Sequence, residues 1–175
     1  MRRRGPRDQE VLGSETRWGM GMALFLSTIV NKVDRKGRVS VPAAFRAALT
    51  GEGFSGAVLF PSISLAAIEG WGMGRMEQLS AGIDALNPFS DERDAFAMSI
   101  LAAAHQLPFD TEGRVVLPPP LIEHANLGEH AAFVSRGSTF QIWEPVALRA
   151  SQEEARKRAR ADRQTLKLRP EDPGS

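Results

Sequence analysis

Residues 33–42 read Val-Asp-Arg-Lys-Gly-Arg-Val-Ser-Val-Pro, and residues 109–118 read Phe-Asp-Thr-Glu-Gly-Arg-Val-Val-Leu-Pro. Both stretches place an aspartate, a glycine, an arginine and a proline at the same spacing. The matched positions lie 76 residues apart and are Asp34 with Asp110, Gly37 with Gly113, Arg38 with Arg114, Val39 with Val115 and Pro42 with Pro118. A motif that recurs in this way indicates two copies of one structural unit.

Each copy predicts a β-hairpin that is followed by a helix. An aspartate side chain can accept hydrogen bonds from the backbone ahead of it, and glycine adopts a positive φ without strain. We therefore expect Asp34 and Gly37, with Asp110 and Gly113, to be structural turn residues. The alternating apolar residues after each turn predict a half-buried strand, and the proline can open a helix. Because such a hairpin is marginal alone, each copy needs a partner.

The repeat extends beyond the motif. In the first half, residue preferences predict a helix and then two strands, at Ala43–Leu49, Gly56–Phe60 and Ile63–Ala67. The second half predicts the same order, at Pro119–Ala125, Ala131–Ser135 and Thr139–Trp143. An offset of 75 residues would match Val58 with Phe133 and Leu65 with Phe140.

Further segments flank and join the two repeats. The first strand is expected at Leu24–Val33, one helix at Trp71–Leu79, and another from an N-cap at Ser90 to about Ala103. We divide the chain into a disordered extension (1–21), a first repeat (22–79), a linker helix (80–103), a second repeat (104–150) and a charged tail (151–175). The working chain is expected to begin near Met22. Arginines before an apolar run also leave a signal peptide as the alternative interpretation of the start.

Composition restricts the classes of function. The chain has no cysteine, which excludes disulfides and thiolate chemistry. The spacing of the three histidines, His105, His124 and His130, does not match that of metal ligands. The glycine-rich residues 70–74 lack the Lys-Ser/Thr ending of a phosphate-binding loop. We therefore expect neither an enzyme nor a bound cofactor or metal. The net charge is +1, so a basic surface must come from local arrangement.

Charge distinguishes the two turns. Arg35, Lys36 and Arg38 crowd the first, and cations at a rigid hairpin tip can contact phosphates and base edges of DNA. In the second turn Thr111 and Glu112 replace two of these cations. We therefore expect Arg114 to have a structural role, in which it forms an ion pair with Asp110. Arg38 can form the equivalent ion pair with Asp34 and contact DNA at the same time. The basic residues of 151–169 predict a solvated face or a secondary DNA contact.

The two motifs in this order, with the closing Phe140-Gln-Ile-Trp143-Glu, resemble the MraZ family of bacterial transcriptional regulators over about residues 22–150. The resemblance implies an α+β, mainly β fold, in which two tandem AbrB/SpoVT-like swapped hairpins form one intrachain β-barrel with flanking helices. It also implies a ring-shaped homo-oligomer that binds repeated elements in double-stranded promoter DNA, including its own promoter, upstream of division and cell-wall genes.

Such a protein would be a cytoplasmic, nucleoid-associated repressor with no membrane or small-molecule partner. The family's basic first-repeat loop maps onto Arg35, Lys36 and Arg38. Two other classes remain open: an AbrB-like antitoxin or other DNA-binding regulator, and a self-assembling structural protein without a role on DNA.

Overall fold

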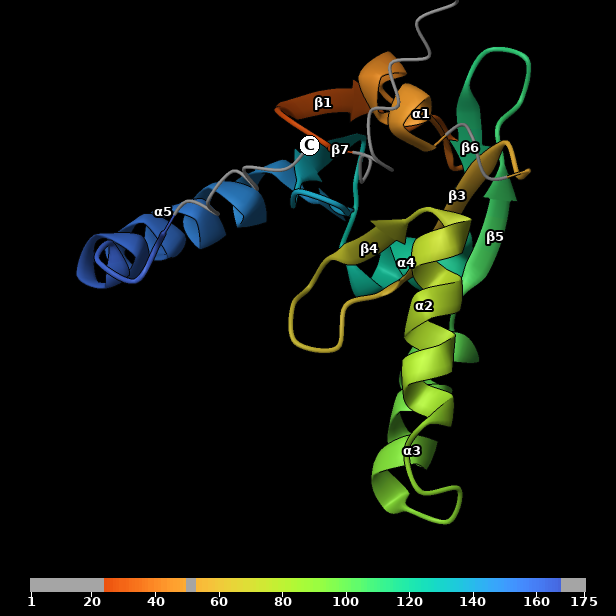
Figure 1. Ribbon diagram of the computed structural model, residues 1–175. Coiled ribbons are helices and arrows are strands. Elements are labelled where there is room, and N and C mark those ends of the chain that lie inside the picture. Colours follow the sequence, from red (N-terminus) through yellow and green to blue (C-terminus); the bar gives the residue numbers. More distant parts are fainter. Residues whose placement is uncertain (1–23, 50–52, 168–175) are drawn as a thin grey trace, which may run out of the picture.

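The computed structural model describes residues 24–49 and 53–167 (Figure 1). The expected extension 1–21 and the expected start at Met22 lie outside these residues. The first half contains β1 (Thr28–Lys32), β2 (Arg38–Ser40), α1 (Ala43–Leu49), β3 (Gly56–Pro61), β4 (Ile68–Trp71) and α2 (Met73–Asp84). The second contains α3 (Asp91–Phe96), the π-helical turn η1 (Ala97–Leu101), β5 (His105–Pro108), β6 (Arg114–Val116), α4 (Pro119–His124), β7 (His130–Ser135), β8 (Phe140–Trp143) and α5 (Pro145–Asp162).

The strands form two antiparallel sheets in an α+β fold. Six strands lie in the order β1-β7-β8-β4-β3-β5, and β2 pairs with β6 in a separate two-stranded ribbon. The expected closed β-barrel is wrong for the described residues, because β1 and β5 are the open edges of the large sheet. After β1 the chain turns away from the sheet. β1 is linked to the ribbon by an isolated bridge between Val33 and Val39 and by a hydrogen bond that Asn31 Nδ2 donates to the Ser40 carbonyl at 2.6 Å.

Strands of the two repeats are interleaved in the large sheet, with β1 and the pair β4-β3 from the first repeat and the pair β7-β8 and β5 from the second. β1 of the first repeat pairs with β7 of the second, and β5 of the second pairs with β3 of the first. This register corrects two expected correspondences. Phe133 pairs with Ile29, and Leu59 pairs with His105. Ile29 and His105 are equivalent positions of the two repeats, 76 residues apart, so the counterpart of Phe133 is Leu59 and not Val58. Ile68 and not Leu65 is the counterpart of Phe140, because the connection before β4 is longer than the one before β8.

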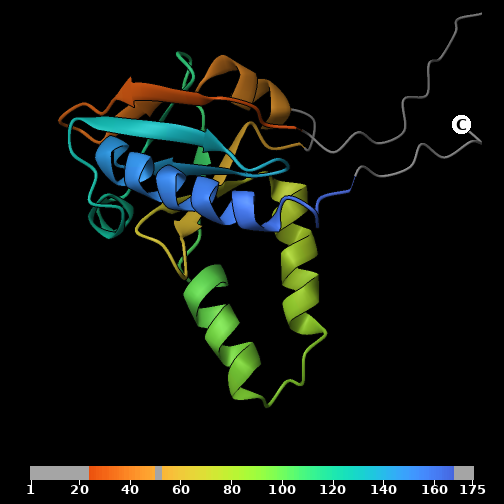
Figure 2. The ribbon, with the colours of Figure 1, turned by 90° about the vertical axis from the view of Figure 1, so that its left-hand side faces the viewer.

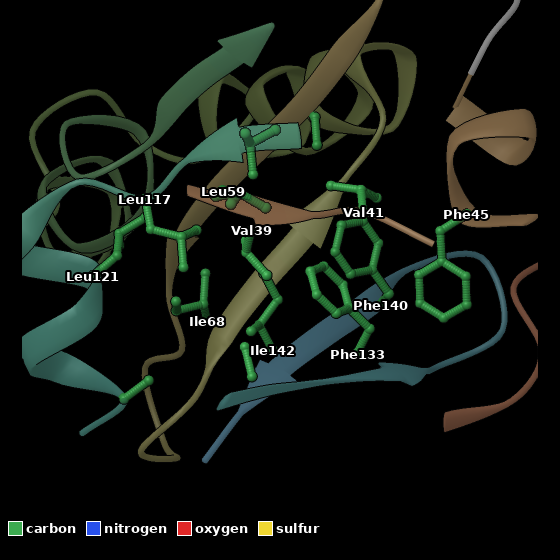
Figure 3. Packing of buried hydrophobic residues seen from close by; sticks show 14 of the residues in the cluster. Val39, Val41, Phe45, Leu59, Ile68, Leu117, Leu121, Phe133, Phe140 and Ile142 are labelled. Atoms are coloured by element: carbon green, nitrogen blue, oxygen red, sulfur yellow. The ribbon is translucent and has the colours of Figure 1, made fainter. Parts of the chain in front are cut away.

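The main core lies between the large sheet and the ribbon (Figure 3). Val39 and Val41 from the first repeat meet Val115 and Leu117 from the second over the inner face of the sheet. Four fully buried phenylalanines contact one another with ring-centroid distances of 5.3 to 6.2 Å, namely Phe25, Phe45, Phe133 and Phe140. Three of these five contacts are edge-to-face, and edge-to-face contacts stabilise a core beyond their buried area. Both repeats therefore share one core.

Helices cover the opposite face of the sheet. Leu148 of α5 packs on Ala132, Val134 and Trp143, which alternate with the core-facing residues of β7 and β8. At the other end, Val58 and Phe60 of β3 contact Met76 of α2 and Ile100 of η1. Because successive side chains of a strand point to opposite faces, α5 and the α2–α3 helical hairpin lie on the side of the sheet away from the ribbon (Figure 2).

The predicted helix at Ala43–Leu49 is confirmed, and so is the N-cap at Ser90, whose side chain accepts a hydrogen bond from the backbone N–H of Arg93. The predicted strand Leu24–Val33 is shorter, because Ser27 has a φ of 85° and β1 begins after it. The predicted helix to Ala103 changes at Phe96 into the π-helical turn η1.

The segment around β4 differs most from expectation. The predicted strand Ile63–Ala67 is a loop closed by a hydrogen bond from the backbone N–H of Ser62 to the carbonyl of Ala67. Trp71 belongs to β4 rather than to the following helix, which begins at Met73. Gly70 of β4 packs against the ring of Phe140, since a Cβ at Gly70 would lie 2.2 Å from that ring. Gly70 is thus explained by close packing.

Candidate nucleic-acid interface

The first turn is held by the Asp34 carboxylate. Its Oδ1 accepts hydrogen bonds from the backbone N–H groups of Lys36 and Arg38, each at 2.9 Å, and its Oδ2 accepts from Arg38 Nε at 2.6 Å. Gly37 takes a φ of +77° and donates its N–H to the Asp34 carbonyl at 3.0 Å. The hydrogen bond from the Arg38 backbone, more than any other contact, lowers the pKa of Asp34 below its usual value.

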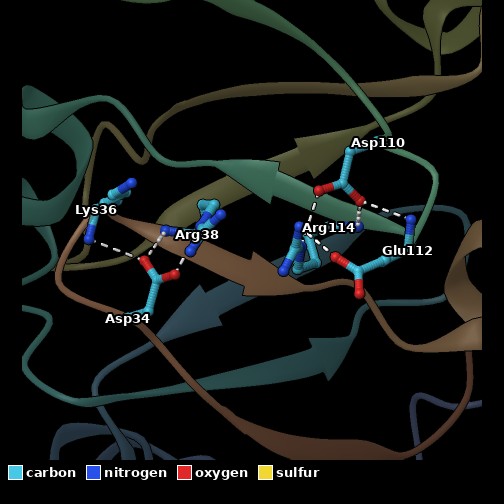
Figure 4. Close-up of polar contacts among 6 residues, drawn as sticks. All are labelled: Asp34, Lys36, Arg38, Asp110, Glu112 and Arg114. Atoms are coloured by element: carbon cyan, nitrogen blue, oxygen red, sulfur yellow. Dashed lines mark hydrogen bonds and ion pairs between the residues drawn. The ribbon is translucent and has the colours of Figure 1, made fainter.

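The second turn repeats this arrangement atom for atom (Figure 4). Asp110 Oδ1 accepts from the backbone N–H groups of Glu112 and Arg114 at 2.9 and 2.8 Å, and Oδ2 accepts from Arg114 Nε at 2.8 Å. Gly113 has a φ of +72°. The same backbone hydrogen bond lowers the pKa of Asp110, and the bond to Asp110 raises the pKa of Arg114. The shared sequence pattern thus produces the same turn twice.

The two arginines differ in their second contact. Arg114 also forms an ion pair through Nη2 with Glu112, so both of its sides are engaged by carboxylates. Arg38 contacts a carboxylate only through Nε among the described residues, and its side chain is 36% exposed. Its terminal Nη groups have no ion-pair partner in that part of the chain, and a guanidinium in this state can donate a bidentate pair of hydrogen bonds.

The β2–β6 ribbon brings the turns together. Val39 lies opposite Val115 and both are buried, so the alternate residues Arg38, Ser40, Arg114 and Val116 face outward. Arg38 is opposite Val116, and Arg114 is opposite Ser40. Arg38 and Arg114 are therefore diagonal neighbours, which in antiparallel pairs lie about 7–8 Å apart. Figure 4 shows both guanidinium groups between the two turn aspartates. Sequence spacing gave no sign of this proximity.

Each turn is also supported by the helix of the other repeat. A Cβ on Gly37 would lie 3.4 Å from Ile122 of α4, whereas a Cβ on Gly113 would lie 2.5 Å from the guanidinium of Arg46 of α1. Arg46 donates through Nη1 to the Val41 carbonyl. The acidic second turn is thus in contact with an arginine of the other repeat, whereas the basic first turn is in contact with an isoleucine. Sequence reasoning missed Arg46, because a lone arginine in a helix gives no signal of the turn that it contacts.

The result is an asymmetric outer face. Arg35 and Lys36 are exposed, and their side chains form no ion pair within the described residues. With Arg38 and Asp34 they give the first turn a formal charge of +2, whereas Arg114 with Asp110 and Glu112 gives the second a charge of −1. The predicted cations Arg35, Lys36 and Arg38 are therefore gathered at one exposed end of the ribbon.

Other kinds of site were also considered in the described part of the chain. It contains no group of three or more histidine, aspartate or glutamate side chains placed to hold a metal ion. None of its helices combines the length and the apolar character that a membrane-spanning helix needs.

Comparison with known proteins supports the resemblance seen in the motifs. A family model described as "MraZ protein, putative antitoxin-like" matches residues 100–169. The chain is 48% identical over 144 residues to "Transcriptional regulator MraZ" of Pelagibacter ubique (strain HTCC1062), an alignment that covers 82% of this chain and 93% of that protein. It is 47% identical over 146 residues to the protein of the same name from Rickettsia canadensis (strain McKiel), covering 83% of this chain and 98% of that one.

Both alignments span more than four fifths of this chain and more than nine tenths of the relative. With the duplicated aspartate-glycine-arginine motif and its shared geometry, identity at this level shows that the chain belongs to the MraZ family.

Proposed function

We propose that the protein is a DNA-binding repressor whose basic first turn reads promoter DNA. The observation that carries this proposal is the gathering of three cations at the end of the β2–β6 ribbon, where Arg35 and Lys36 are exposed and Arg38 is held by Asp34. Arg38 Nε is fixed by Asp34 at 2.6 Å, and its Nη groups have no ion-pair partner in the described residues. A guanidinium held in this way suits the O6 and N7 acceptors of guanine, while Arg35 and Lys36 contact phosphates.

The second turn has a different role in this proposal. Asp110 and Glu112 repel phosphates and hold Arg114, so this turn positions the ribbon rather than reading bases. Asp34, Gly37, Asp110, Gly113 and Arg114 are accordingly structural. Each repeat acts as an AbrB/SpoVT-like unit whose strands are exchanged with those of the other.

The proposed targets are repeated elements upstream of a division and cell-wall gene cluster, including the protein's own promoter. One ribbon presents few contacts and a chain of net charge +1 has little general attraction for DNA. A ring-like homo-oligomer overcomes this weakness, because after the first contact the others become intramolecular. Such a protein works in the cytoplasm at the nucleoid. That the relatives are named transcriptional regulators supports the proposal.

The test compares two arginines that make the same turn contact. Arg38→Ala should weaken binding to the upstream DNA by about 1–3 kcal/mol per engaged subunit. Arg114→Ala removes the equivalent bond to Asp110 and is the matched control, so its affinity per folded protein should stay near that of the wild type. Lys36→Ala should weaken binding to all sequences and flatten the salt dependence.

Fluorescence anisotropy with upstream and scrambled duplexes at two salt concentrations measures these effects, with melting temperatures recorded for each variant. Equal loss of binding in Arg38→Ala and Arg114→Ala at unchanged stability would show that both turns read DNA. Unchanged binding in all three variants would refute the interface.

A further inference from the structure

Two elements project from the body of the subunit with opposite charge. The α2–α3 helical hairpin extends from one end of the sheet, and α5 extends from the other (Figures 1 and 2). Residues 73–101 carry five acidic and two basic side chains, whereas residues 149–167 carry seven basic and three acidic side chains. No ion pair joins the two elements within the described part of one subunit.

Four of the seven basic side chains lie along one side of α5, with Glu153 at the border of that side. At 100° per residue, Arg149, Arg156, Arg160 and Arg163 fall within about 60° of one another. We call these four residues the basic stripe. Beyond Gln152 every described residue of α5 is exposed, so the packing of α5 on the sheet does not require the basic stripe.

A groove with a mostly apolar surface adjoins the start of the basic stripe, and Glu129, His130 and Glu144 also line it. Arg149 lines this groove together with Val30 of β1 and Pro145 and Val146 of α5. Val30 is 50% exposed and Val146 is 62% exposed. The surface therefore combines an apolar end with a row of arginines.

The helical hairpin carries the complementary pattern. Phe89 at its tip is 96% exposed, and Asp91 and Asp94 of α3 follow on the exposed side with Met98. Arg93 forms an ion pair with Asp84 of α2 at 2.9 Å. The positive charge of α3 is therefore paired with an acidic residue of the same hairpin. Asp91 and Asp94 have no ion-pair partner in the described residues.

We propose that the hairpin tip of one subunit docks on the α5 surface of a second copy, with Phe89 in the Val30–Val146 groove and Asp91 and Asp94 along the basic stripe. This contact rests on the oligomer proposed above and names its surfaces. It joins two different patches, so it is heterologous, and repetition of a heterologous contact builds a ring when the rotation closes.

The placement of α5 favours a protein partner over DNA. α5 and the hairpin both cover the face of the sheet opposite the ribbon. DNA that lies on Arg35, Lys36 and Arg38 is therefore on the far side of the subunit from the basic stripe. A contact between copies through α5 and the hairpin leaves the ribbon accessible.

A charge-exchange experiment on the full chain tests the contact. Light scattering over a concentration series would compare the wild type with R156E/R160E/R163E, with D91K/D94K, and with the combined five-fold variant. Exposed ion pairs are individually weak and salt-screened, but several lost together should raise the dissociation concentration of the oligomer at least about tenfold. The combined variant restores the attraction with reversed sign, so it should assemble again.

Phe89→Ser gives a second test that leaves helix charges unchanged. It should weaken assembly, whereas Ile63→Ser, at an exposed apolar residue in the loop before β4, should not. A wild type that stays monomeric would refute the proposed ring together with this contact. A wild-type oligomer with variants that assemble equally well would refute this contact alone. Normal assembly of R156E/R160E/R163E with weaker binding to a single-element duplex would assign α5 to DNA and refute the contact.

Discussion

Truncation of Trp143 should be much more costly than truncation of Trp71, although the two residues occupy the same place in the two repeats. Trp71 lies opposite Val58, and Trp143 lies opposite Ala132 in the equivalent strand pair. Trp143 is only 5% exposed and packs under α5. Trp71 is partly exposed beside Phe60 and Arg75.

The polar contacts increase this difference. The indole N–H of Trp143 donates to Gln141 Oε1 at 2.9 Å, and Gln141 Nε2 donates to Glu69 Oε1 at 2.7 Å. Trp143→Ala removes a buried side chain, which costs about 3–5 kcal/mol. It also leaves the buried Gln141 carbonyl without its donor, which favours the upper end of that range. The indole N–H of Trp71 has no hydrogen-bond partner in the described residues. Removal of the Trp71 side chain therefore leaves no acceptor in that part of the chain without its donor.

For a chain of this size, about 2–4 °C of melting temperature corresponds to each kcal/mol, so Trp143→Ala should lower the melting temperature by about 6–20 °C. Trp71→Ala should cost about 1–3 kcal/mol. Circular dichroism melts and urea titrations at one fixed protein concentration measure both, because oligomer stability depends on concentration. Equal costs, or a larger cost for Trp71→Ala, would refute the assignment of Trp143 to the buried contact beneath α5.

Three further changes have expected outcomes. Gly37→Ala should destabilise the fold by about 1–2 kcal/mol in urea titration, because φ is +77° there and alanine is strained at that angle; a neutral effect would contradict the turn geometry. Lowering the pH should destabilise the wild type below about pH 4, because the lowered pKa values of Asp34 and Asp110 give stability that is present above the unfolded-state pKa and lost as the pH falls through the folded-state pKa. The double substitution Asp34→Asn and Asp110→Asn should flatten this loss, and an unchanged pH profile of the urea midpoint would count against it. Ser90→Ala should weaken α3 by about 0.5–2 kcal/mol, since the side chain caps the helix at 3.2 Å from the N–H of Arg93; hydrogen exchange confined to α3 would detect this, and unchanged protection would oppose it.

The sequence by itself determined the local parts of the candidate interface. The turns at Asp34–Arg38 and Asp110–Arg114 were predictable, because each is closed by bonds between residues no more than four apart in the chain. The helix at Ala43–Leu49 and the cap at Ser90 were predictable for the same reason. The repeat also indicated two equivalent units, each with strands and a helix.

Only the tertiary structure decided how these units meet. The β2–β6 pairing places Arg38 beside Arg114, and α1 places Arg46 against Gly113, although these residues are more than sixty positions apart in the chain. The strand register also moved the counterpart of Phe133 from Val58 to Leu59. A one-residue shift in register moves every side chain of a strand to the other face of the sheet. Such contacts depend on which apolar faces bury one another across the whole chain, and that choice is not contained in any local pattern.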